Sequence, residues 1–262
     1  FMKNIDKNMK QNLLKKTYRI LIPNASSPRN IGDQAILTGL IELIKNVHKG
    51  AKIKIHSVDP KMYAKKIAHE IDHTLYSWSI FKDRKIFSRF INLSKLLIQY
   101  IVLRFGIEGI HIDKKLNYLI KDYKNADLII FVGGGYLRSR KGIKQSLNLL
   151  MQLLVFKYAE LFSAKKIVAP ISVGPFGYKW LEKIVVNVLK QMDLVTVREE
   201  FSYNILKKYK MKNIVLSSDH GFMIRKSNKK NNRKFTLGFT VREWLNGDEY
   251  TKFEKSFIES IQ

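Results

Sequence analysis

Apolar and polar positions along the chain follow two patterns, one typical of buried strands and the other of helices. Short continuous apolar runs that end at Gly, Pro or Asp predict parallel strands covered on both faces. Between them, apolar residues recur every three or four positions, which predicts amphipathic helices. We expect strands at residues 17–22, 52–58, 127–132, 166–173, 193–197 and 213–216, and helices from residue 33 and over residues 145–162, 180–189 and 199–209.

This alternation predicts an α/β fold with a doubly wound, mostly parallel, Rossmann-like sheet over residues 17–225. The strand pattern lapses over residues 61–124, where we expect a helical insertion. Residues 1–16 read as a basic tail, and the polar, charged residues 226–234 read as an interdomain linker. Residues 235–262 have the pattern of one more strand and helix, the expected start of a second, truncated Rossmann-like domain.

Glycine-containing loops follow three of the predicted strands. The first strand leads to Gly32 and Asp33 at an expected helix start, and later strands end at Gly133-Gly134-Gly135 and at Gly174-Pro175. A helix start presents unpaired backbone N–H groups and a partial positive charge, which suit an anion or a sugar hydroxyl. Because ligands of doubly wound sheets lie beyond the carboxyl ends of the strands, these loops predict a shared site.

The chain is strongly basic, with 48 Lys and Arg against 22 Asp and Glu and a formal net charge of +26. Such a balance is compatible with a Lys-rich solvated surface, an anionic small molecule, an anionic membrane surface or nucleic acid. The basic residues are spread along the whole chain without a nucleic-acid-binding motif, so we expect no nucleic-acid partner. Cysteine is absent and no apolar run reaches the roughly 18 residues that span a bilayer, so we expect a cytoplasmic protein.

A basic aromatic stretch lies at residues 78–105, and residues 87–105 contain Lys and Arg but no acid. This pattern has two interpretations. One is a helix lying in a bilayer interface, with peripheral contact to the inner face of the cell membrane. The other is a helix that covers the sheet while its basic residues face water.

The order of several short motifs resembles the polysaccharide pyruvyl transferase family. The matching stretches are Asn30-Ile31-Gly32-Asp33-Gln34-Ala35-Ile36-Leu37, Ala126 to Ile130 leading into Gly133-Gly134-Gly135, Ile171 to Pro175, Val195 to Ser202, Ser218-Asp219, and Gly238 to Arg242. The resemblance implies two Rossmann-like domains facing a cleft, as in GT-B glycosyltransferases. It also implies transfer of the enolpyruvyl unit of phosphoenolpyruvate to sugar hydroxyls, usually forming a ketal on a cell-surface polysaccharide or its precursor.

Such a reaction needs an anion clamp, an acid, and a base for the hydroxyls. The catalytic candidates are Asp33 as base or contact for acceptor hydroxyls, Arg198 as clamp for carboxylate or phosphate, and His220 as acid. Each has a structural alternative: a helix cap for Asp33, an ion pair with a Glu for Arg198, and a solvent-facing or structural histidine for His220.

The candidates for substrate binding surround these residues in the motifs: Asn30, Gly32, Gly133, Gly134, Gly135, Arg138, Ser172, Gly174, Asp219 and Arg242. The glycines serve a tight turn equally well. Phosphoenolpyruvate is the expected donor, and a saccharide, which is lipid-linked in one form of the hypothesis, is the expected acceptor. We expect no cofactor and no metal. Two alternatives stay open: a GT-B glycosyltransferase using a nucleotide sugar, and a non-catalytic glycan-binding relative.

Overall fold

A computed structural model of the chain describes residues 17–64, 69–75, 77, 86–107, 109–224 and 248–259. The chain divides into two compact units, residues 1–225 and 226–262. The described part of the first unit is an α/β domain, and that of the second is the helix α10 (Asp248–Glu259). The predicted basic tail, the predicted linker and the strand expected at residues 235–241 lie outside the described residues.

The first unit is built on a sheet in which every strand pair is parallel. Its strands are β1 (Arg19–Ala25), β2 (Lys52–Ser57), β3 (Glu70–His73), β4 (Leu128–Phe131), β5 (Gly134–Ser139), β6 (Lys165–Phe176), β7 (Leu194–Val197) and β8 (Ile214–Leu216). They lie in the order β3-β2-β1-β4-β6-β7-β8, with β5 also paired to β6. The order reverses between β1 and β4, and doubly wound sheets bind their ligands at such a reversal. The predicted α/β, doubly wound, Rossmann-like fold is therefore confirmed.

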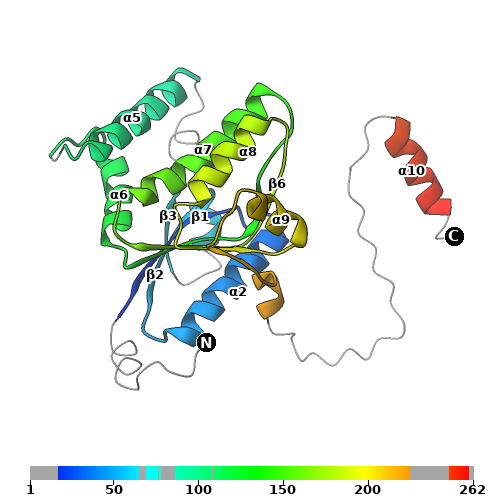
Figure 1. Ribbon diagram of the computed structural model, residues 1–262, viewed down its shortest axis with the longest axis horizontal. Helices are drawn as coiled ribbons and strands as arrows, with labels where there is room; N and C mark the ends of the chain where they lie inside the picture. The colour runs from blue at the N-terminus through cyan, green and yellow to red at the C-terminus, as the bar shows by residue number, and fades with distance from the viewer. Residues whose placement is uncertain are drawn as a thin grey trace. The chain divides into compact units, whose positions relative to one another are not determined.

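Helices cover both faces of this sheet (Figure 1). On β1, Ile20 and Ile22 pack in one buried cluster with α2, whereas Leu21 packs in a second cluster on the opposite face. This burial on both sides explains why the strands read as continuous apolar runs. The helices are α2 (Ile31–Val47), α3 (Pro60–Ala64), α5 (Ile86–Arg104), α6 (Lys114–Asn125), α7 (Ile143–Glu160), α8 (Lys179–Leu189), α9 (Glu200–Lys208) and the 3-10 helix η1 (His220–Met223).

Two strands lie where the sequence pattern predicts none. β3 falls inside the expected helical insertion at residues 61–124 and pairs with β2, so the insertion is not purely helical. β5 begins at the second glycine of the triplet, Gly134, and pairs with β6. Neither strand has an apolar run, since β3 reads Glu-Ile-Asp-His and β5 reads Gly-Gly-Tyr-Leu-Arg-Ser. The neighbouring strand, rather than the local sequence, holds each of them in place.

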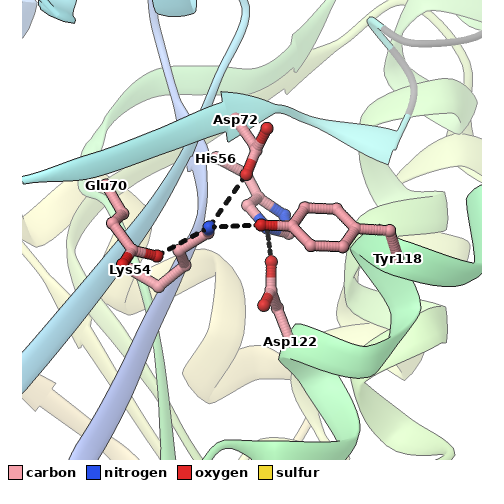
Figure 2. A network of polar contacts seen from close by, with 6 residues as sticks. All are labelled: Lys54, His56, Glu70, Asp72, Tyr118 and Asp122. Carbon is pink, nitrogen blue, oxygen red and sulfur yellow. Dashed lines mark hydrogen bonds and ion pairs between the residues drawn. The ribbon is translucent and has the colours of Figure 1, made fainter. Parts of the chain in front are cut away.

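The strand β3 is attached to its neighbours by a polar network centred on Lys54 of β2 (Figure 2). The Lys54 Nζ lies 3.0 Å from Glu70 Oε2 and 2.9 Å from Asp72 Oδ2, and it donates a hydrogen bond to the Tyr118 hydroxyl at 3.1 Å. Burial by itself lowers the pKa of Lys54, but its bonds to Asp72, Tyr118 and Glu70 outweigh this and raise the pKa. The ammonium thus stays charged and joins β2, β3 and α6.

We expect Lys54→Met to lower the free energy of unfolding by about 2 kcal/mol, because Glu70 and Asp72 lose their cation in a partly buried setting. The Tm should fall by about 4–8 °C, since about 1 kcal/mol shifts a domain of this size by about 2–4 °C. Lys165→Met is the control: Lys165 also lies 2.9 Å from an aspartate, but its side chain is 75% exposed against 17% for Lys54. Equal shifts in thermal unfolding of the two variants would contradict this account.

Candidate functional site

Arg198 lies at the centre of a charged cluster at the carboxyl edge of the sheet. Directly after β7, its Nε donates a hydrogen bond to Ser172 Oγ of β6 at 2.7 Å, and its Nη1 donates to Asp219 Oδ2, beyond β8, at 2.7 Å. An arginine has five N–H donors in a planar fork. Within the described part of the chain, no acceptor is bonded to Nη2. The guanidinium is therefore held in one orientation with donors left for an anion.

Asp33 lies in the first turn of α2 on the same edge. The helix is capped by Asn30, whose Oδ1 accepts hydrogen bonds from Gly32 N at 3.0 Å and from Asp33 N at 3.4 Å. The Asp33 carboxylate is therefore not needed as the cap. Burial raises the pKa of Asp33, although a hydrogen bond from Ser26 and the charge of Arg198 oppose the shift. A carboxyl that retains its proton to higher pH suits acid–base chemistry.

The glycines of the triplet Gly133-Gly134-Gly135 have two different structural roles. A Cβ on Gly133 would overlap a backbone carbonyl of β6, so this glycine lets the two strands approach. Gly134 has a φ of +125°, which favours glycine, and a Cβ there would lie 4.0 Å from Asp33 Oδ1. A Cβ on Gly135 would lie 3.5 Å from Arg198 Nη2. The second and third glycines thus border the two charged groups.

We expect Gly133→Ala to cost about 3 kcal/mol of stability, because its Cβ would overlap the carbonyl oxygen of Pro170 and lie 2.9 Å from the carbonyl carbon. Backbone atoms cannot move aside as a flexible side chain can, so the strands must separate. Gly50→Ala is the matched control, since nothing lies within 4 Å of a Cβ there, and it should change stability by less than about 0.5 kcal/mol. Denaturant unfolding measures both, and an unchanged midpoint for Gly133→Ala would refute the overlap.

Two residues that the sequence patterns do not single out hold the glycine loop in place. Asn24 Oδ1, at the end of β1, accepts a hydrogen bond from Val132 N at 2.8 Å. Its Nδ2 donates to the Tyr136 hydroxyl at 2.6 Å, and that hydroxyl donates to Val132 O at 2.9 Å. This network joins β1 to the loop where the strand order reverses. The available signal was an asparagine directly after the predicted apolar strand, where a partly buried amide needs hydrogen-bond partners.

A hollow of about 630 Å³ lies beside the cluster. It is lined by Arg198, Glu199, Glu200, Leu216, Ser217, Ser218, Asp219 and Phe222. One of its glutamates is engaged, since Glu199 Oε1 accepts a hydrogen bond from Ser202 Oγ at 2.7 Å. The hollow gives a small molecule access to the guanidinium from the side of β8.

His220 follows Asp219 but does not line the hollow beside Arg198. It lines a separate, largely apolar hollow of about 410 Å³ together with Leu40 of α2 and Ala169 of β6. Burial lowers the pKa of His220 although Asp219 opposes the shift, so the imidazole is neutral at neutral pH. Its backbone passes directly over α2, where a Cβ on Gly39 would overlap the His220 carbonyl oxygen.

Within the described residues, no hydrogen bond or ion pair joins Gly174 or Arg138 to this cluster. Gly174 has a φ of +83°, and a Cβ there would meet Ile205 of α9 at 3.0 Å and the Phe176 ring. Arg138 is exposed on β5. Arg242 lies outside the described residues. Among the described residues, no three His, Asp or Glu side chains gather closely enough to hold a metal ion.

The structure thus brings together Asp33, Gly134, Gly135, Ser172, Arg198 and Asp219. The fold and this cluster define a Rossmann-like α/β protein whose charged residues gather at the carboxyl edge of its sheet. The family model described as polysaccharide pyruvyl transferase matches residues 30–261. This is most of the chain, so the chain belongs to the polysaccharide pyruvyl transferase family, as its motifs predict. A comparison with curated proteins finds no match.

Proposed function

We propose that this protein transfers the enolpyruvyl unit of phosphoenolpyruvate to two hydroxyls of a saccharide, forming a pyruvate ketal. The observation that carries the proposal is the fixed guanidinium of Arg198, which has free donors and lies close to the carboxyl of Asp33. Membership of the family supports a transferase with a saccharide acceptor. The donor and its mode of binding are inferred from the chemistry of the site.

The donor carries a carboxylate and a phosphate, both of which bind well to charged or oriented N–H groups. In the proposal, the free Nη2 of Arg198 takes one of these anions. Gly135 leaves room for it, because a Cβ at this position would be in contact with Nη2, at 3.5 Å. Ser172 and Asp219 hold the guanidinium in place, so little orientational freedom is lost when the donor binds.

The reaction requires a balanced exchange of bonds and protons. The methylene carbon of the donor gains a proton, and the central carbon forms bonds to two sugar oxygens while its bond to the phosphate oxygen breaks. The two hydroxyls lose two protons, of which one balances the proton gained by carbon and one leaves with phosphate. The site must therefore accept a proton from a hydroxyl and stabilise negative charge on the departing phosphate.

We assign the first task to Asp33 and the second to Arg198. Asp33 lies on the partly buried edge of the site, where its raised pKa makes it a stronger base than an exposed aspartate. The proposal gives His220 no step, because this residue lines the hollow next to α2 and not the one beside Arg198.

Isothermal titration calorimetry of the chain with phosphoenolpyruvate and with a panel of nucleotide sugars tests this function. We expect heat of binding with phosphoenolpyruvate alone, and release of inorganic phosphate when a saccharide acceptor is added. Binding of a nucleotide sugar without binding of phosphoenolpyruvate would instead favour the GT-B glycosyltransferase alternative. Binding of saccharide alone would favour a non-catalytic glycan-binding protein.

A further inference from the structure

The helix α5 is amphipathic in an unusual sense, because polar side chains lie on its inner face. Asn92, Leu96, Gln99 and Val102 are buried against the rest of the domain. Gln99 Nε2 donates a hydrogen bond to the Ile110 carbonyl at 3.2 Å, and Gln99 Oε1 accepts one from Ile112 N at 3.1 Å. The inner face is thus fixed by amide hydrogen bonds as well as by apolar packing.

The outer face of α5 is apolar. Ile98 is 50% exposed and Ile101 is 52% exposed, and Phe105, directly after the helix, is 77% exposed. These residues are three and four positions apart, so they form one stripe along the helix. Further large apolar residues are exposed on or just beyond α5: Ile91, Leu97, Ile107 and Ile110. Single exposed apolar residues are ordinary, but a group of this size marks an interaction surface.

The helix α6 provides the contrast, because it has the usual arrangement. Its buried residues are apolar, and Lys114, Lys121 and Lys124 are exposed on its outer face. In Figure 1, α5 lies at the periphery of the layer formed by α6, α7 and α8. The neighbouring helix α6 therefore lacks the apolar outer face that α5 has.

The charge of this stretch of the sequence favours one kind of partner. The stretch of sequence that contains α5, residues 84–107, has no acidic residue and five basic ones, Arg84, Lys85, Arg89, Lys95 and Arg104. Arg104 is exposed, and Lys95 is paired with Asp113, before α6, at 3.5 Å. A second copy of the chain would bring these cations against like charges on a protein of net charge +26. A lipid surface with anionic headgroups offers the opposite charge together with an apolar layer for the exposed side chains.

We propose that the outer face of α5 binds the surface of membranes that contain anionic phospholipids, with the helix lying along the interface. None of the helices in the described residues is long and apolar enough to cross a bilayer. Ile98, Ile101 and Phe105 enter the boundary between headgroups and acyl chains, and Arg104 contacts the headgroups. This inference goes beyond the proposed transferase function and does not depend on it.

Flotation of the full chain with phospholipid vesicles tests the proposal. The protein should float with vesicles that contain phosphatidylglycerol, bind less as salt is added, and stay unbound with pure phosphatidylcholine. The double variant Ile98→Glu/Ile101→Glu should reduce the bound fraction at least about tenfold, because two carboxylates would have to enter the apolar layer. Both side chains are exposed, and thermal unfolding checks that the variant keeps its fold.

A matched control separates this face from general attraction by charge. Lys121→Gln/Lys124→Gln on α6 removes the same two units of net charge and should reduce binding less than about twofold. Equal losses in the two double variants, or full binding by the isoleucine variant, would overturn the proposal. The proposal would also be overturned if sedimentation found a dimer that Ile98→Glu/Ile101→Glu dissociates and the chain did not bind anionic vesicles. A second copy of the chain would then cover this face.

Discussion

Replacing Arg198 by alanine should weaken phosphoenolpyruvate binding at least about 100-fold. Hydrogen bonds to charged groups contribute about 1.5–3 kcal/mol each, and about 1.4 kcal/mol corresponds to a factor of ten in Kd. Arg198→Lys should recover only part of the affinity, because an ammonium is a point charge that cannot replace the fork between Ser172 and Asp219. Calorimetry with phosphoenolpyruvate measures the three Kd values.

The control for this experiment is Arg19→Ala. Arg19 lies at the amino end of β1, the opposite edge of the same sheet, and its Nε lies 3.4 Å from Asp127 Oδ2. Its loss removes the same charge from the chain and should leave Kd unchanged within about twofold, since charges beyond a Debye length are screened. If Arg198→Ala binds the donor as tightly as the wild type while keeping its fold, the clamp is placed on the wrong residue.

Replacing Asp33 by asparagine should lower the rate of phosphate release about 100-fold or more while changing the Kd of the donor little. Asparagine has nearly the same shape and still accepts a hydrogen bond from Ser26, but it cannot take up a proton. The steady-state rate with a saccharide acceptor, compared with calorimetry, separates the two quantities. An unchanged rate would remove Asp33 from the chemistry even if the donor still binds.

The same variant should be more stable than the wild type at neutral pH. The pKa of Asp33 is raised by burial above its ordinary value of 3.8, so the folded state binds the proton more tightly than the unfolded state. Unfolding free energy therefore falls as pH rises above 3.8 and stays reduced once the carboxyl is ionised in both states. The gain in Tm of Asp33→Asn should be largest near neutral pH and shrink as the pH approaches 3.8.

The sequence pattern predicts β1, β4 and β6 as continuous apolar runs, and it also predicts β2, β7 and β8 correctly. β1, β4 and β6 read as apolar runs because each contributes side chains to both buried clusters, one on each face of the sheet. β3 and β5 could not be predicted in this way, because their residues are mostly polar or glycine and their strand conformation comes from pairing with β2 and β6. Local sequence does not record a partner that is distant along the chain.

The candidate site was predictable in outline for a related reason. In a parallel sheet the carboxyl ends of the strands share an edge, so Asp33, Ser172 and Arg198 could be expected to lie near one another. The bonds that join them could not be predicted, since the Arg198–Ser172 contact spans 26 residues. The same limit applies to Asn24 and Tyr136, which are 112 residues apart.

The close approach of η1 to α2 has a consequence for how this protein can diverge. Asp33 lies in the first turn of the helix that carries Gly39, and Asp219 directly precedes His220, whose carbonyl passes over that glycine. The distance between the Asp33 and Asp219 carboxylates thus depends on a close main-chain approach between α2 and η1, with no side chain between Gly39 and the His220 carbonyl. Most of the surrounding apolar residues can be exchanged without altering this spacing. We therefore expect Gly39 to vary less among homologous chains than its neighbours in the helix.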